Sequence, residues 1–240
     1  QPSLRNTLLK RSGRIADQVG RVFSDEHASD SHRLAAARAV VFFAGNDGPR
    51  LARLASLATP GQLEILLPEL TRSCDQAARA VLAGLVAQQP TSGLSNAQRV
   101  ALGRQRAATA ISLLRLEELQ SSHGAFHIQD DPESLTQFVH RCREYGVPSS
   151  QLVRSLQSAT DVYSRFALLL ALGDYPLAEI DDSERDGLIT ELTAAYRSDP
   201  SSAIHGATDW LLRKWGFEQV VTDVDRTPLP YDETGRRQWY

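Results

Sequence analysis

The chain has 240 residues, of which 42% are hydrophobic and 23% are charged, and this is enough apolar material for a folded protein with a substantial core. Its formal net charge of −3 excludes the basic excess with which proteins usually meet nucleic acid or an anionic membrane. The sequence contains no charged and then apolar leader, and no apolar run of about 18 residues. We therefore expect a cytoplasmic protein without a signal peptide or membrane span.

Helix start and stop signals alternate along the chain, and between them apolar residues recur with helical spacing. Ser95, for example, stands where a first helical turn needs an acceptor. Gly45, Gly146, Gly173 and Gly216 stand where a left-handed cap would end a helix. No segment alternates as a half-buried strand would, so the sequence predicts an all-α fold. The predicted helices span residues 4–23, 30–44, 49–57, 60–72, 75–88, 96–118, 132–145, 149–157, 160–173, 183–197 and 201–215.

A short phrase occurs five times: a basic or amide residue, any residue, an alanine, and an apolar run. Its copies begin at Arg33, Gln76, Arg106, Arg165 and His205. Repetition on this scale indicates stacked helical hairpins, since one hairpin cannot bury its apolar face alone. The spacing is about 43 residues between the first two copies and about 40 between the last two, as in HEAT-type pairs, but it is uneven in between. We expect an irregular HEAT-like α-solenoid, with a compact helical bundle as the alternative. The basic or amide residues are expected to make surface contacts.

Two stretches interrupt the helical pattern. Residues 119–131 are expected to form a longer connection. Residues 217–240 are expected to form an extended tail, because two prolines and a glycine prevent a continuous helix there. The expected organisation is a HEAT-like repeat domain at 1–216, followed by a tail that leads toward a further domain. The absence of methionine and the start at Gln1 also favour a segment of a larger protein.

Candidate metal ligands are few. His123 and His127 lie four residues apart and are followed by Asp130 and Asp131, which are residue types that bind metals. Gly124 disfavours a rigid helix between the histidines, and Asp131 has a role in starting the next helix. The only cysteines, at 74 and 142, lie outside any metal-binding spacing, so we expect two buried thiols and neither a disulfide framework nor a zinc site. We expect no metal and no cofactor.

Candidate catalytic residues are also few. His205, Asp209 and Arg213 repeat at i, i+4 and i+8 along one helix. Charge pairing along the helix explains this spacing, whereas general-base chemistry would need a converging nucleophile that the sequence does not identify. Phosphate-loop, dinucleotide, nucleophile-elbow and protein-kinase motifs are absent. We expect no catalytic residue. The alternative, an enzyme site built from His205, Asp209 and a distant residue such as His140, requires these groups to meet in one pocket.

Several segments, taken together, resemble a known family. They lie at residues 68–70, 104–116, 138–141, 165–175, 199–216 and 237–240, and the fifth closes with Trp-Leu-Leu-Arg-Lys-Trp-Gly. They are similar to the HEAT-like helical region of large bacterial proteins in which this region precedes a formylglycine-generating-enzyme-like domain of C-type-lectin fold. Such proteins often carry a serine/threonine protein kinase domain at the amino end. The resemblance implies a spacer or docking scaffold, and it transfers no catalytic residue because the family's enzymatic sites lie in other domains.

The sequence thus favours a non-catalytic helical-repeat scaffold or docking module within a larger bacterial signalling protein. Its partner would be another protein or a domain of the same polypeptide, and we expect no nucleic acid, membrane or small-molecule ligand. The candidate contact residues are aromatic: Trp210, Trp215, Trp239 and Tyr240. A further alternative is a regulatory fragment or a recognition substrate of a protease or kinase, with residues 119–131 or the tail as its exposed segment.

Overall fold

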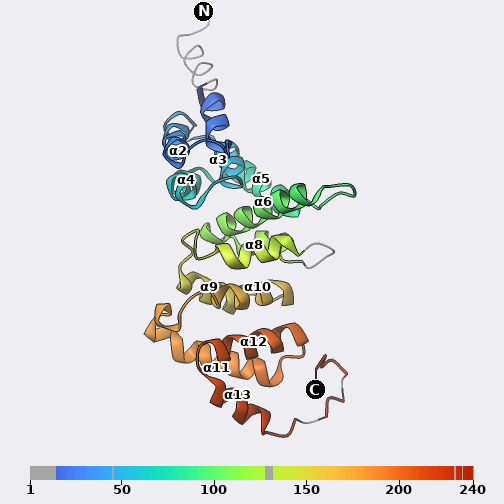
Figure 1. The fold of residues 1–240 in the computed structure, drawn as a ribbon. Helices are drawn as coiled ribbons and strands as arrows, with labels where there is room; N and C mark the ends of the chain where they lie inside the picture. The colour runs from blue at the N-terminus through green and yellow to red at the C-terminus, as the bar shows by residue number, and fades with distance from the viewer. Residues whose placement is uncertain (1–14, 45, 128–131, 230, 234, 240) are drawn as a thin grey trace, which may run out of the picture. The chain divides into compact units, whose positions relative to one another are not determined.

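A computed structural model describes residues 15–44, 46–127, 132–229, 231–233 and 235–239. The regular elements in these ranges are all helices, and no strand occurs among them (Figure 1). The prediction of an all-α fold is therefore confirmed. No helix in the described ranges is long and apolar enough to cross a membrane. The chain divides into two compact units, which are described separately: unit 1 is Gln1–Ala125 with Gln129–Gly146, and unit 2 is Phe126–Ile128 with Val147–Tyr240.

Unit 1 begins, in its described part, with helical residues 15–24. The helices that follow are α2 (Asp30–Ala44), α3 (Gly48–Ala55), α4 (Pro60–Ser73), α5 (Gln76–Ala87), α6 (Asn96–Arg115), α7 (Leu119–Ser122), the short 3-10 helix η1 (His123–Ala125) and α8 (Glu133–Arg141). Helix α2 packs on α4, α3 packs on both α4 and α5, and α6 packs on α5 and α8. Leu51, Leu66, Leu82 and Ile111, from four different helices, are fully buried between them. Each apolar stripe is thus covered by a neighbouring helix, as an amphipathic helix requires.

The helix starts follow local chemistry that the sequence already indicates. At the start of α6, the Ser95 hydroxyl accepts from the Gln98 backbone N–H at 3.3 Å, and the Gln98 side chain accepts from the Ser95 N–H at 2.9 Å. This reciprocal pair satisfies two of the backbone donors that a helix start leaves without partners. The prediction of a helix start at this point is confirmed.

The glycines that were expected to end helices divide into two kinds. Gly146 and Gly216 have φ values of 66° and 86°, the left-handed conformation that glycine adopts without a Cβ penalty. Gly173 does not: its φ is −63°, so the predicted left-handed cap is wrong there. A Cβ at Gly173 would lie 2.1 Å from Cη2 of Trp210, so glycine is needed because an indole packs on the backbone. Gly45 lies outside the described residues.

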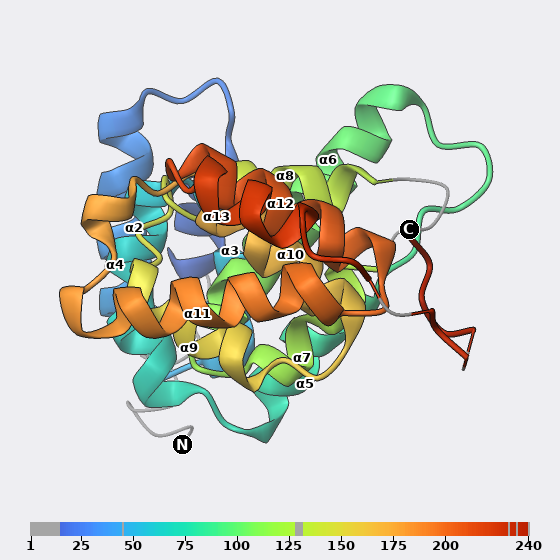
Figure 2. The same cartoon turned by 90° about the horizontal axis from the view of Figure 1, so that it is seen from below.

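Unit 2 contains α9 (Ser149–Ser158), α10 (Val162–Leu172), the 3-10 helix η2 (Leu177–Glu179), α11 (Asp182–Ser198), α12 (Ser202–Lys214) and α13 (Glu218–Asp225). Helix α9 packs on α10, and α11 packs on α12, so consecutive long helices form two pairs (Figures 1 and 2). The second helices of the two pairs, α10 and α12, also pack on each other, and α13 packs on both α11 and α12. The core of this unit therefore runs continuously from the first pair to the second.

Both stretches that were predicted to be irregular contain helices. Residues 218–225 form α13, so the prediction of an extended chain after Gly216 is wrong for this stretch. The reason is burial: Val221 is fully buried, which stabilises a short helix that its own sequence signal does not demand. The expected long connection at 119–131 likewise contains α7 and η1, and residues 128–131 lie outside the described ranges.

The repeated phrase has a structural role different from the expected one. Its alanine is buried in the last four copies, at Ala78, Ala108, Ala167 and Ala207, which allows close approach of neighbouring helices. Its polar residue was expected to make surface contacts, and this is wrong for Arg106, which is only 4% exposed. A buried guanidinium needs acceptors, so this residue holds together segments of its own unit.

The partners of Arg106 show what it holds together. Its Nε donates to the carbonyl of Val86 at 3.0 Å, near the end of α5, and its Nη1 donates to the Ser134 hydroxyl of α8 at 2.8 Å. A third bond runs to the carbonyl of Gly124. The fourth residue after Val86 is Pro90, which has no N–H, so the helix cannot supply the donor for the Val86 carbonyl. Arg106 supplies it and places a cation at the negative end of α5.

The two cysteines differ in accessibility. Both cysteines are reduced thiols. Cys142 is fully buried, as expected. Cys74 at the end of α4 is partly accessible, so the prediction of two buried thiols is wrong for this residue. Burial raises the pKa of the Cys74 thiol, and the neighbouring Arg79 only partly offsets this effect.

We expect an alkylating reagent such as iodoacetamide to modify one thiol of the native chain, at Cys74, and to modify Cys142 only after unfolding. Because the thiolate is the reactive form and the pKa is raised, the rate should still be rising with pH where that of free cysteine has levelled off. Mass spectrometry of digested, pulse-labelled protein measures both sites. Equal labelling of the two cysteines under native conditions would contradict the structure.

Candidate functional site

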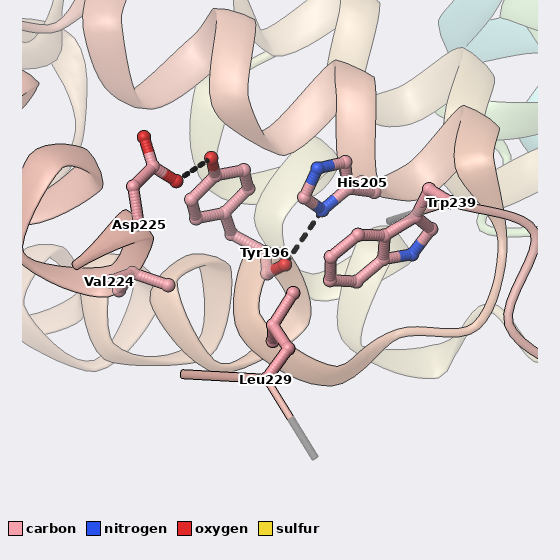
Figure 3. A pocket seen from close by; sticks show the side chains of 6 residues that line it. All are labelled: Tyr196, His205, Val224, Asp225, Leu229 and Trp239. Atoms are coloured by element: carbon pink, nitrogen blue, oxygen red, sulfur yellow. Dashed lines mark hydrogen bonds between the residues drawn. The ribbon is translucent and has the colours of Figure 1, made fainter. Parts of the chain in front are cut away.

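Three aromatic side chains from separate parts of unit 2 form a stack. Tyr196 near the end of α11 lies on His205 of α12 with ring centroids 4.5 Å apart and an interplanar angle of 15°. His205 in turn lies on Trp239, with centroids 3.6 Å apart and an angle of 13° (Figure 3). The imidazole therefore lies between a phenol and an indole, and both of its faces are covered.

Hydrogen bonds to backbone carbonyls fix the orientation of the stack. His205 Nδ1 lies 2.8 Å from the carbonyl oxygen of Tyr196. Because a carbonyl only accepts, we assign a proton to Nδ1, and in the neutral form of the imidazole Nε2 is then an acceptor. The indole N–H of Trp239 donates to the carbonyl of Asp199 at 2.7 Å. The single N–H donor of Trp239 and that of the imidazole are both used within the unit.

The tail is attached to the start of α12 just beside this stack. The Gln238 backbone N–H donates to the carbonyl of Pro200 at 2.9 Å, and the Gln238 side-chain oxygen accepts from the Ser202 N–H at 3.2 Å. Ser201, the N-cap residue of α12, makes no side-chain capping bond. Gln238, which lies 36 positions beyond Ser202, thus supplies an acceptor that the first turn of α12 needs. These bonds bring Trp239 against His205.

A cavity of about 270 Å³ opens beside the stack. It is lined by Tyr196, His205, Val224, Asp225, Leu229 and Trp239 (Figure 3). The Tyr196 hydroxyl donates to Asp225 Oδ1 at 2.5 Å. Burial, followed by this hydrogen bond, raises the pKa of the Tyr196 phenol, so the phenol stays protonated and remains a donor. The cavity therefore combines apolar and aromatic walls with one carboxylate.

The residues expected to contact a partner have different surroundings. Trp210 is 39% exposed, packs on Gly173, and has Lys214 Nζ 4.8 Å from its ring centroid. Trp215 is buried, and its indole N–H donates to the carbonyl of Tyr175 at 3.0 Å, so a partner would find little of it to contact. Contact of a partner with Trp215 stays a prediction. Trp239 packs on the chain's own last helices, and Tyr240 lies outside the described residues.

The residues expected to form a charge-paired row do so in part. Asp209 Oδ1 lies 2.8 Å from Arg213 Nε, which confirms the intrahelical ion pair. His205 does not join this row, because it stacks with aromatic rings and bonds to the Tyr196 carbonyl instead. Asp209 does not line the cavity beside His205. The His205–Asp209 acid–base pair of the enzyme alternative is therefore not assembled within unit 2, and His140 belongs to α8 of unit 1.

The candidate metal ligands are not brought together among the described residues. No group of three or more histidine, cysteine, aspartate or glutamate side chains that could hold a metal ion occurs in that part of the chain. His127 contacts the Tyr163 ring, with centroids 4.4 Å apart and an interplanar angle of 40°. Asp130 and Asp131 lie outside the described ranges.

Sequence reasoning identified two of the six cavity residues, His205 and Trp239, because their residue types are unusual in their segments. It missed Tyr196, a buried aromatic residue near the end of α11, and Asp225 at the end of α13. No local signal connects them, since Tyr196 and Asp225 lie 29 positions apart.

Comparisons of this chain with models of protein families, with curated proteins and with solved structures found no match.

Proposed function

We propose that this chain is a non-catalytic scaffold or docking module, built as an irregular HEAT-like solenoid, that contacts another protein or a further domain of its own polypeptide. It would act within a cytoplasmic bacterial signalling protein. The observation that carries the proposal is the packing order of the helices. In unit 1, α2 packs on α4 and α3 packs on α5; in unit 2, α10 packs on α12 and α11 packs on α13.

This order supports a repeat architecture because in these four cases a helix packs on the one after next. In a solenoid of hairpins, first helices stack on first helices and second helices on second helices, which produces this pattern. A compact bundle mixes near and distant helices instead. Such arrays present extended surfaces that suit protein partners better than small substrates.

A surface suited to a partner lies on α12. Trp210 is held against the backbone of α10 at Gly173 and beside Lys214, yet 39% of it is exposed. A large aromatic side chain that is already oriented loses little conformational entropy on binding, and such residues dominate the energy of many interfaces. The family resemblance of residues 199–216 supports a partner in a following formylglycine-generating-enzyme-like domain.

Labelling the protein with 5-fluorotryptophan tests this proposal, since each of the three tryptophans then gives its own fluorine resonance. In a polypeptide that continues past Tyr240 into a further domain, we expect the Trp210 resonance to differ from that of the 240-residue chain and to lose its sensitivity to solvent isotope. Trp215 is the internal control, because its burial and its bond to Tyr175 should be the same in both. A reading frame that ends at Tyr240, or an unchanged Trp210, would contradict docking of a following domain.

A further inference from the structure

The cavity beside the aromatic stack has a chemical property that the scaffold proposal does not use. The polar side chains that line it are Asp225, Tyr196, His205 and Trp239. All their hydrogen-bond donors are already used, whereas several acceptors remain.

Asp225 has one oxygen without a close donor. Its Oδ1 accepts from Tyr196, but its Oδ2 lies 3.9 Å from Arg213 Nη2, which is beyond hydrogen-bond distance. Its side chain is 51% exposed, so this oxygen is accessible. The carboxylate is the only charged group that lines the cavity in the described part of the chain. A ligand here meets a negative charge.

The neighbouring groups are acceptors as well. The single O–H of Tyr196 is used on Asp225, so the phenolic oxygen can only accept a further bond. The Nδ1 proton of His205 is used on the Tyr196 carbonyl, so Nε2 carries a lone pair, and no other hydrogen bond of this imidazole occurs among the described residues. The indole N–H of Trp239 is used on Asp199. The walls are completed by Val224 and Leu229, which have no polar side-chain atoms.

We infer that this cavity binds a small organic cation that carries several N–H donors, a primary alkylammonium or alkylguanidinium group. Such a group has several donors for the acceptors that line the cavity, and its charge is matched by the Asp225 carboxylate. The alkyl part packs on Val224 and Leu229. An anion or a ligand with only acceptors would repel the Asp225 carboxylate or compete with hydrogen bonds that the lining donors already make. The inference departs from the expectation of no small ligand, and it does not depend on the scaffold proposal.

The same chemistry has two sources, a free amine or the lysine side chain of a partner protein. Butylammonium represents the first and has about the length of the lysine side chain. The peptide acetyl-Gly-Lys-Gly-amide represents the second. Tighter binding of one of them assigns the source, and binding of either supports the site.

Titration of ¹⁵N-labelled chain with butylammonium tests the inference, with the indole N–H resonances as probes. We expect a saturable shift of the Trp239 resonance with a Kd of about 1 mM, as befits a ligand of few heavy atoms, and no shift of Trp215. Two matched ligands separate the contribution of the N–H donors from that of the positive charge. Butyltrimethylammonium keeps the charge but has no N–H donor, and butanol has no charge. Equal affinity for butyltrimethylammonium, or no saturable shift with butylammonium, would overturn the inference.

Three variants locate the site. D225N should weaken butylammonium binding about tenfold or more, because it removes the charge and replaces an acceptor by a donor. R213Q should tighten binding about threefold, because it removes the cation nearest to that carboxylate. D223N, the same change two residues away on an exposed part of α13, is the control and should have little effect. The inference fails if D223N and D225N weaken binding equally, or if nitrogen chemical shifts show that the His205 proton is on Nε2.

Discussion

Replacing Arg106 with methionine should lower the free energy of unfolding of unit 1 by about 3 kcal/mol. The methionine keeps much of the volume but leaves the carbonyls of Val86 and Gly124 without their side-chain donor. Pro90 prevents the helix itself from supplying a donor to Val86, so local rearrangement offers no easy replacement. Lysine at this position should recover only part of the loss, because an ammonium does not reproduce the planar fork of donors.

The readout is the rate at which the buried thiol of Cys142 is labelled, in a C74S background. Because Cys142 lies in unit 1, its exposure reports opening of that unit, and a loss of about 3 kcal/mol corresponds to labelling roughly a hundredfold faster. R104M is the matched control: it removes an exposed arginine two residues earlier on the same helix and should change stability by less than about 0.5 kcal/mol. If R104M and R106M had equal effects, the buried hydrogen bonds of Arg106 would not be stabilising the unit.

Replacing Gly48 with alanine should also destabilise unit 1, by about 2 kcal/mol or more. A Cβ at Gly48 would lie 2.1 Å from the carbonyl oxygen of Ser73 and 3.2 Å from Cβ of Ala78. The first of these is a backbone atom, so it cannot move aside as the tip of a flexible side chain would. Relief requires α3 to shift relative to the end of α4.

Gly84 provides a control of opposite sign. It lies in the exposed middle of α5, and a Cβ there would meet nothing within 4 Å. Alanine at Gly84 should therefore stabilise unit 1 by about 0.5 to 1 kcal/mol, because it lowers the conformational entropy of the unfolded chain. Urea denaturation followed by far-UV circular dichroism measures both variants. A stabilising effect of G48A would mean that the helix ends are not packed as closely as the structure shows.

The helices were largely predictable because their signals are local. The Ser95–Gln98 capping pair spans four residues, and the apolar stripes that predicted the long helices repeat every few residues. One exception is α13, whose sequence contains no comparable start or stop signal. It forms because Val221 is buried against other helices, and no window of sequence contains that information.

The candidate site was predicted only in part, for the same reason. His205 and Trp239 were conspicuous by residue type, but their chemistry was misread, since the expected partner of His205 was Asp209 in its own helix. In the structure, Asp209 pairs with Arg213, and His205 is stacked between Tyr196 and Trp239. These contacts depend on how α11, α12 and the tail pack.

The sequence by itself determined the helical class, the positions of most helices, and the glycine caps at Gly146 and Gly216, because these depend on interactions within a few residues. Only the tertiary structure decided that Arg106 is buried and that Gly173 lies beneath an indole. It also decided that the acceptors of Tyr196, His205 and Asp225 surround one cavity. The physical reason is that a side chain's burial, and its hydrogen-bond partners across helices, are set by which surfaces pack together, and packing joins residues that lie far apart along the chain.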